Sequence, residues 1–248
     1  MSSNSPLRAD AAVIALVGGA HATSHLFHLL LPPLFPLLMP EFGFGYTEAG
    51  FLMTVFFAIS GTGQALAGIV VDRFGARRTL MAGVGLLAAS GLALAVALNY
   101  WMLVLAVALA GLGNAVFHPA DFSLLNQKVT PGRLGYAFSA HGLSGNLGWA
   151  LGAAISGTAL AWGGWRFAGV AAAGVAVISI LGLHLARPLL DDDRHSVSGG
   201  HGALRATFGF LGLPVIWLSF AFFLLVTAAF GGLQSFSVPV LGGLYGVS

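Results

Sequence analysis

The sequence of 248 residues lacks cysteine and carries few charged side chains. Without Cys the chain has no disulfide, no thiolate metal site and no cysteine nucleophile. Only 7% of its residues are charged, whereas a soluble domain carries about 25%, so a soluble globular protein is excluded. A formal net charge of +2 provides no basic surface for nucleic acid. Proline is also sparse, and the 36 glycines follow no triplet repeat, which excludes a collagen-like chain.

Hydrophobic residues, in contrast, make up 57% of the chain and gather in long continuous runs. A bilayer core of about 30 Å requires about 20 apolar residues in a helix. Runs of this length indicate membrane helices, because the strands of a β-barrel alternate over about ten residues. We therefore predict an all-α membrane protein with seven spans, at roughly 11–38, 47–71, 79–97, 101–125, 134–161, 167–186 and 208–241.

The basic residues predict the orientation of these spans. With the N-terminus placed inside, nine of the ten Lys and Arg residues fall on the inner side and Arg166 alone falls outside. This bias is the positive-inside pattern of an inner (cytoplasmic) membrane protein with a cytoplasmic N-terminus. The inner set is Arg8, Arg73, Arg77, Arg78, Lys128, Arg133, Arg187, Arg194 and Arg205.

A polar stretch suggests how the chain is divided. We predict a six-helix half at 1–186, a cytoplasmic linker at 187–207, and the first helix of a second half at 208–248. The acids of the linker, with His195 and His201, offer metal binding as an alternative to a solvated connection. The first and last spans both end in Pro followed by a Gly/aromatic turn and a hydroxyl residue. We therefore expect the seventh span to restart a repeat whose remainder this sequence does not contain.

The loop between the second and third spans, at 68–78, carries the sharpest motif, GIVVDRFGARR. Gly68 permits close helix contact, Asp72 needs a partner where its helix leaves the membrane, and Gly75 permits a tight turn. This segment resembles the signature loop of the major facilitator superfamily of secondary transporters. The residues that fit the pattern are Gly68, Asp72, Arg73, Phe74, Gly75 and Arg78, with Arg77 beside them and Ala76 where a basic residue is usual.

Further segments resemble transporters like the fosmidomycin-resistance exporter: residues 21–25 with 34–38, the run 116–119 with Asp121, and residues 145–148 with Gly152. The resemblance implies a rocker-switch carrier with two six-helix halves and one site between them, often driven by protons. It also implies that Asp72 braces against the second half. The sequence departs from the antiporter pattern, since it has no Arg near 107–111 and no Gly-Pro pair in its fifth span.

Ionisable residues inside spans are candidate functional groups, because burying them unpaired costs several kcal/mol. His21, His25 and His28 recur at i, i+4 and i+7, which places them in a wedge of about 60° on the first span. We predict that His21 and His25 bind a polar substrate or relay protons. The alternatives are neutral rings that hydrogen-bond neighbouring helices, or a zinc site made by these three side chains.

The fourth span repeats this spacing with Asn114, His118 and Asp121. We predict that Asn114 contacts substrate and that His118 and Asp121 belong to a gate. Asp121 would pair with Arg77 or Arg73 of the signature loop, and the pair would break as the halves rock. A static salt bridge at a helix end is the alternative. Pro119 is expected to kink the helix.

Small and polar residues mark the remaining spans. In the fifth span, Gly145, Gly148 and Gly152 form a stripe with His141, which predicts close helix packing. Asn146, on another face of that span, and Gln64, in the second span, are weaker candidates for substrate contact.

The function predicted from the sequence is proton-coupled transport of a small organic solute, with drug or metabolite efflux as one form. Its partners are the solute, protons, the lipid bilayer and a missing second half; we expect no cofactor, metal, nucleic acid or enzymatic activity. One alternative is a rhomboid-like intramembrane protease, because residues 142–145 read Gly-Leu-Ser-Gly and His184 follows on a later span. Ser144 and His184 would, however, lie at different depths. The other alternative is a membrane subunit that does not transport.

Overall fold

The computed structural model describes residues 6–191 and 209–246. Within these ranges the regular structure is helical and contains no strand. The chain divides into two units, Met1–Arg194 and His195–Ser248. Residues 192–207 of the predicted linker, with His195 and His201, and the terminal Ser248 lie outside the described residues.

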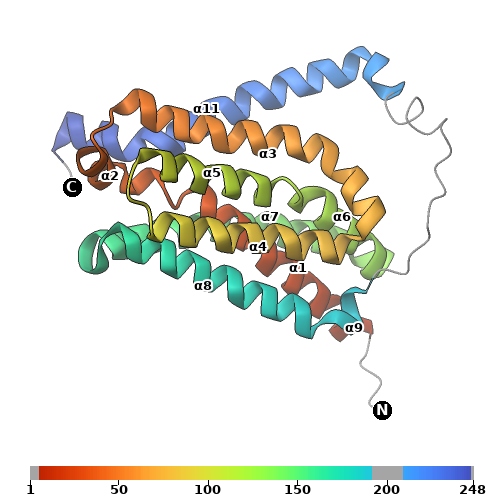
Figure 1. Cartoon of the computed structure of the whole chain (residues 1–248). Coiled ribbons are helices and arrows are strands. Elements are labelled where there is room, and N and C mark those ends of the chain that lie inside the picture. Colours follow the sequence, from red (N-terminus) through yellow and green to blue (C-terminus); the bar gives the residue numbers. More distant parts are fainter. Residues whose placement is uncertain (1–5, 192–208, 247–248) are drawn as a thin grey trace. The chain divides into compact units, whose positions relative to one another are not determined.

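The helices of the first unit run roughly side by side (Figure 1). Short segments connect or extend them, namely η1 (Pro32–Leu34), η2 (Pro131–Arg133), the π-helical η3 (Ala159–Gly163) and α9 (Arg187–Leu190). The main helices are α1 (Pro6–His28), α2 (Phe35–Phe42), α3 (Tyr46–Phe74), α4 (Ala76–Ala95), α5 (Tyr100–Asn114), α6 (Phe117–Lys128), α7 (Leu134–Thr158) and α8 (Gly164–Leu185). The second unit contains η4 (Gly209–Gly212) and α11 (Pro214–Tyr245).

Six helical segments are long and apolar enough to cross a membrane, and they coincide with six of the seven predicted spans. The remaining predicted span, at 134–161, corresponds to α7, whose 25 residues extend about 37 Å at 1.5 Å per residue. This helix carries His, Asn, Ser and many Gly residues in place of large apolar side chains. The predicted all-α membrane fold is confirmed. The six segments are Pro6–Phe42, Tyr46–Phe74, Ala76–Ala95, Tyr100–Lys128, Gly164–Leu185 and Pro214–Ser237.

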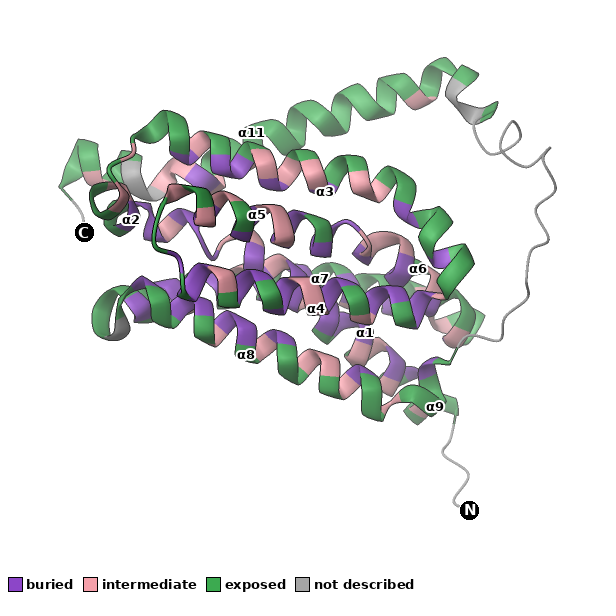
Figure 2. Cartoon of the chain, viewed as in Figure 1, coloured by how far each residue is buried: buried purple, intermediate pink, exposed green. Residues whose placement is uncertain are grey.

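Small residues allow the helices of the first unit to approach closely. On α4, a Cβ placed on Gly91 would lie 2.7 Å from the carbonyl oxygen of Gly169 on α8, and the reverse distance is 2.6 Å. Gly83 of α4 and Gly113 of α5 make the same reciprocal approach, at 2.8 and 2.7 Å. Without a hydrophobic drive between helices in lipid, such backbone contact supplies much of the packing energy. Accordingly, α4 is largely buried in the bundle (Figure 2).

The contact between α1 and α7 follows the predicted glycine stripe. A Cβ on Gly148 would meet the carbonyl oxygen of Ala22, and one on Gly152 would meet the carbonyl oxygen of Leu26. Both glycines are buried, so the backbones of α1 and α7 touch along one line. This approach brings the histidines of α1 against α7.

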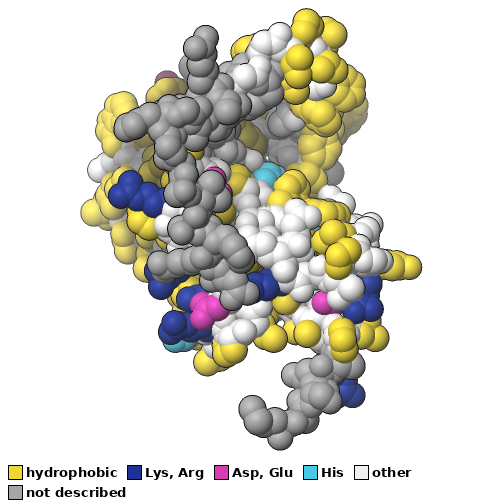
Figure 3. All heavy atoms as spheres, turned by 90° about the vertical axis from the view of Figure 1, so that its right-hand side faces the viewer, with side chains coloured by type: hydrophobic (Ala, Val, Ile, Leu, Met, Phe, Trp, Pro, Cys, Tyr) yellow, Lys and Arg dark blue, Asp and Glu magenta, His cyan; other side chains and the backbone are white. Residues whose placement is uncertain are grey.

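Basic side chains lie on the face of the molecule drawn in Figure 3, and several of them pair with acids. Arg133 donates to Asp10 at 2.6 Å, and Arg77 and Arg187 each donate to Asp191 at 3.2 Å. Desolvation raises the pKa of the Asp191 carboxyl, but Arg187 and Arg77 outweigh it and hold the pKa below its usual value. The two contacts of Asp191 are therefore present above pH ~4 and are lost as acid protonates it.

Adding one methyl group to the α1–α7 contact tests this packing. We expect Gly148→Ala to destabilise the protein by about 1–3 kcal/mol, because its new Cβ would overlap the backbone of Ala22. Gly142→Ala, on the exposed side of α7 with nothing within 4 Å of the added Cβ, is the matched control and should be neutral or slightly stabilising. The measurement is the apparent melting temperature in detergent micelles. Equal melting temperatures for the two variants would contradict the close approach.

Candidate functional site

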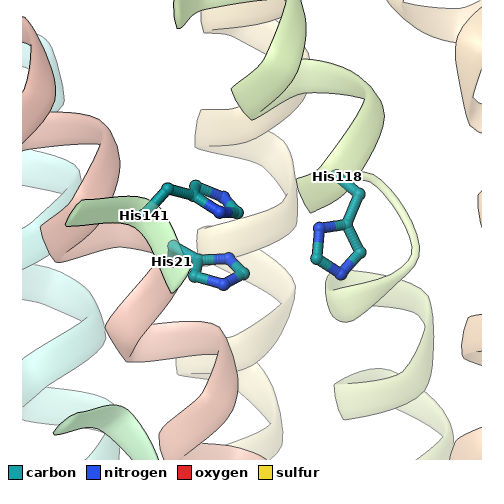
Figure 4. A group of neighbouring side chains, drawn as sticks. All are labelled: His21, His118 and His141. Carbon is teal, nitrogen blue, oxygen red and sulfur yellow. The ribbon is translucent and has the colours of Figure 1, made fainter. Parts of the chain in front are cut away.

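Polar side chains from α1, α6 and α7 converge inside the first unit (Figure 4). The predicted faces of α1 and of the α5–α6 span meet there, and α7 adds His141. His21 and His141 are buried at 3% and 5% exposure, and His118 is the most accessible of the three histidines shown. We call the set His21, His25, His28, His118, His141 and Asp121 the histidine cluster.

Asp121 is the only acid of the histidine cluster, and its side chain is completely buried. Its Oδ2 lies 3.0 Å from Nε2 of His141, in hydrogen-bond geometry, and 3.3 Å from Nδ1 of His21. A carboxylate in an apolar interior is costly unless donors surround it. The ring of His141 supplies one hydrogen bond, and the ring of His21 lies within ion-pair distance. The predicted pairing of Asp121 with Arg77 or Arg73 is therefore wrong for this structure, since Arg77 binds Asp191 instead.

The imidazole rings form a continuous series. His21 stacks on His141 with a centroid distance of 3.6 Å, and His25 lies 4.3 Å from His21. His28 stacks on His25 at 4.7 Å, and His118 flanks His21 at 5.3 Å. The rings thus connect Asp121 with the far end of α1 without a large gap.

Asn114 is the centre of a second polar network. Its Nδ2 donates to Ser24 Oγ of α1 and lies 2.9 Å from Nε2 of His28. Ser60 Oγ of α3 donates to Asn114 Oδ1, and Gln64 Nε2 donates to Ser60 Oγ at 3.1 Å. The structure therefore brings the predicted candidates Asn114 and Gln64 into one network that joins α1, α3 and α5. The predicted candidate Asn146 is exposed on α7.

A break between α5 and α6 lies between Asn114 and Asp121, whose networks meet at His28. The ring of Pro119 is incompatible with a helical carbonyl four residues earlier, at Ala115, and Pro supplies no N–H. Accordingly α5 ends at Asn114 and α6 begins at Phe117. The predicted kink is present as this interruption, which lies between Asn114 and His118.

Gly145 leaves the space that the histidine cluster occupies. A Cβ there would lie 2.9 Å from Nδ1 of His25 and 3.1 Å from Nε2 of His21. The sequence predicted helix packing for this glycine, and the atoms it faces are imidazole rings. The neighbouring Ser144 donates to the carbonyl oxygen of His141 at 2.7 Å, while His184 is exposed on α8. Nothing in this arrangement supports the protease alternative.

The signature loop forms the turn between α3 and α4. Gly75 adopts φ +87° there, a conformation that L side chains rarely adopt, as predicted for a tight turn. Arg77 is buried, whereas Asp72, Arg73 and Arg78 are exposed. At Gly68 an added Cβ would meet nothing within 4 Å among the described residues, so the close contact that this glycine permits is not made inside the first unit. Gly68 lies on an outward face of α3.

No functional role was predicted for His141 from the sequence. Its place on the same stripe as Gly145 was nevertheless a signal, because Gly145 lies one turn away and faces other histidines. Several buried polar atoms of the cluster also lack a hydrogen-bond partner within the described residues. They are Nδ1 of His21, His25 and His118, and Oδ1 of Asp121.

Comparison with known proteins adds the family context. A family model described as Major Facilitator Superfamily matches residues 17–248. The chain is 26% identical over 160 residues to the fosmidomycin resistance protein of Escherichia coli (strain K12), covering 64% of this chain and 39% of that protein. It is 32% identical over 126 residues to a multidrug resistance protein B homolog of Mycobacterium tuberculosis (strain CDC 1551 / Oshkosh), covering 50% and 23%.

A third relative is the puromycin resistance protein of Streptomyces alboniger, 30% identical over 151 residues, which cover 60% of this chain and 30% of that protein. Among solved structures, a peptide transporter in complex with sulfate matches with a TM-score of 0.67 and 19% identity. That match covers 90% of this chain and 50% of the transporter. The chain thus spans half or less of the length of the proteins it matches.

Removing the Asn114 side chain tests the second network. We expect Asn114→Ala to destabilise the protein by about 1–3 kcal/mol, because Ser24, Ser60 and His28 each lose a buried partner. The matched control is Asn126→Ala, since Asn126 is exposed and donates only to the carbonyl oxygen of Phe122 on its own helix. This control should change stability by less than about 0.5 kcal/mol. Thermal unfolding in detergent measures both, and an equal effect would refute the role of the network.

Proposed function

The chain belongs to the major facilitator superfamily, and from that premise we propose that it forms the N-terminal part of a proton-coupled secondary carrier for a small organic solute. The observation that carries the proposal is Asp121, fully buried among membrane helices and held by two histidines. An intramembrane carboxylate of this kind is expected at a proton relay or substrate pathway.

The chemistry of this contact supports the proposal of proton coupling. Asp121 accepts a hydrogen bond from His141 and lies beside His21. The gain or loss of one proton by these three side chains would therefore change the attraction between the carboxylate and the two rings. These side chains come from α6, α7 and α1. Protonation therefore alters the attraction between three helices, and in alternating access such a change favours one arrangement of the bundle over another.

The solute would meet the part of the site beyond Asp121. His25, His28 and Asn114 offer imidazole and amide groups, and Gln64 extends this polar line across α3. Exposed Asn146 is a further candidate on the surface of α7. The relatives are named for resistance to fosmidomycin, puromycin and multiple drugs, which favours a small organic solute and export.

We propose that a second six-helix half completes the carrier. The peptide transporter structure that covers 90% of this chain is only half matched by it. Asp72 is exposed at the end of α3, where it is available to brace against that half. The basic residues at this end of the first unit support a cytoplasmic N-terminus in the inner membrane. In this proposal the chain carries out transport and no covalent chemistry.

Asp121→Asn separates transport from its coupling to protons. In proteoliposomes of the complete carrier, we expect the variant to retain solute counterflow, which requires no net proton movement. Accumulation driven by a pH gradient should fall by roughly tenfold or more. A tenfold change corresponds to about 1.4 kcal/mol in the free energy of one proton equilibrium. Fosmidomycin and puromycin, named for the relatives, are the first solutes to measure.

The matched control is Glu48→Gln, at the exposed first turn of α3, where Gln preserves the capping contact with the Gly45 N–H. It should behave as the unmodified carrier. If Asp121→Asn leaves driven accumulation intact, the cluster does not couple protons. If it abolishes counterflow as well in a folded protein, Asp121 serves substrate binding rather than coupling. An unmodified carrier that shows no counterflow with a broad solute panel would favour the non-transporting subunit.

A further inference from the structure

Three histidines of the cluster come from three different helices and meet at one point. His21 of α1, His118 of α6 and His141 of α7 each offer one ring nitrogen, and these nitrogens lie within 4.8 Å of one another. Figure 4 shows the rings of His21 and His141 stacked together, with His118 facing them from the other side. We propose that these three side chains bind one divalent transition-metal ion of the zinc class.

The ligand type and the spacing support this assignment. Three imidazoles with an open fourth position form a known zinc coordination set, with Zn–N distances of about 2.0–2.1 Å. Tetrahedral bonds of that length bring the nitrogens to about 3.3 Å from one another. Rotation about the side-chain torsions of His21 and His118 covers the difference from 4.8 Å. The ion must also tilt His21 and His141 out of their stack, in which the ring planes differ by 28°.

Asp121 supplies what an ion in this interior needs. Its carboxylate contacts two of the three ligands, at 3.0 Å to His141 and 3.3 Å to His21. A carboxylate that holds the second nitrogen of a metal-bound histidine orients the ring and increases its basicity. The negative charge also offsets the charge of the ion in apolar surroundings. Asp121 Oδ1 and His118 Nδ1 are buried without hydrogen-bond partners within the described residues, so both atoms are available to interact with an ion.

The structure favours this set over the three histidines of α1 that the sequence suggested. His28 already lies 2.9 Å from the Asn114 amide, and its ring stacks on His25 with the planes only 14° apart. His25 and His28 therefore stand beside the site without completing it. His118 is more accessible than His21 and His141, which provides a route for the ion. The site requires only this unit, so binding does not depend on transport.

Titration of the purified full chain with Co²⁺, followed by visible d–d absorption, tests the proposal. We expect saturable binding of one ion per chain with a tetrahedral spectrum, and competition by Zn²⁺. His118→Gln and His141→Gln should each weaken binding by at least the ~10–100-fold that loss of an outer-shell partner costs. Zn²⁺ should also raise the melting temperature of the unmodified chain, since a ligand of the native state stabilises it.

Two controls make the result specific. His184→Gln removes an exposed histidine of α8, and His25→Gln removes a ring next to the site; both should retain full affinity. If His25→Gln weakens binding as much as His118→Gln, the ion binds along α1 and the proposed set is wrong. Absence of saturable Co²⁺ binding by the unmodified chain overturns the proposal, whatever the variants do. Loss of transport in the Asp121→Asn experiment leaves this result unaffected.

Discussion

The contact between the Asp121 carboxylate and the rings of His141 and His21 constrains the rest of the first unit. A buried carboxylate without donors would be costly in a membrane protein, so α6 is held where α1 and α7 present their histidines. Gly145 serves the same contact, because any larger residue would collide with the rings of His21 and His25. Packing between α1 and α7 and the chemistry of the cluster are therefore one arrangement.

The interruption between α5 and α6 lies between two sets of contacts, one around Asn114 and one around Asp121. On one side, Asn114 fixes α5 to α1 and α3 through hydroxyl and imidazole partners. On the other side, Asp121 fixes α6 to α1 and α7. The helical hydrogen bonding is interrupted near Pro119, so the two sets of contacts belong to separate helical segments. For a carrier, this separates the groups proposed for the solute from the groups proposed for the proton.

Local signals in the sequence predicted the helices well, because membrane helices satisfy their own backbone hydrogen bonds and depend on length and apolar composition. The turn at Gly75 and the interruption near Pro119 follow from single-residue backbone constraints, and both were predicted. Gly68 makes no close contact within the described residues, because a small residue permits close approach without specifying a neighbour. The helix α7 was predicted despite its polar residues.

By itself, the sequence determined the all-α membrane class, the family resemblance and the two polar helix faces, all of which depend on residues close together in the chain. Only the tertiary structure decided which residues meet. It assigned Asp121 to His141 and His21 and not to the arginines of the signature loop, and it made His141 part of the site. Helical periodicity gives the face on which a side chain lies, but the neighbour of that face depends on how α1, α6 and α7 pack. The packing of α1 on α7 includes backbone contacts of Gly148 with Ala22 and of Gly152 with Leu26, which lie more than a hundred positions apart in the chain and which no local pattern encodes.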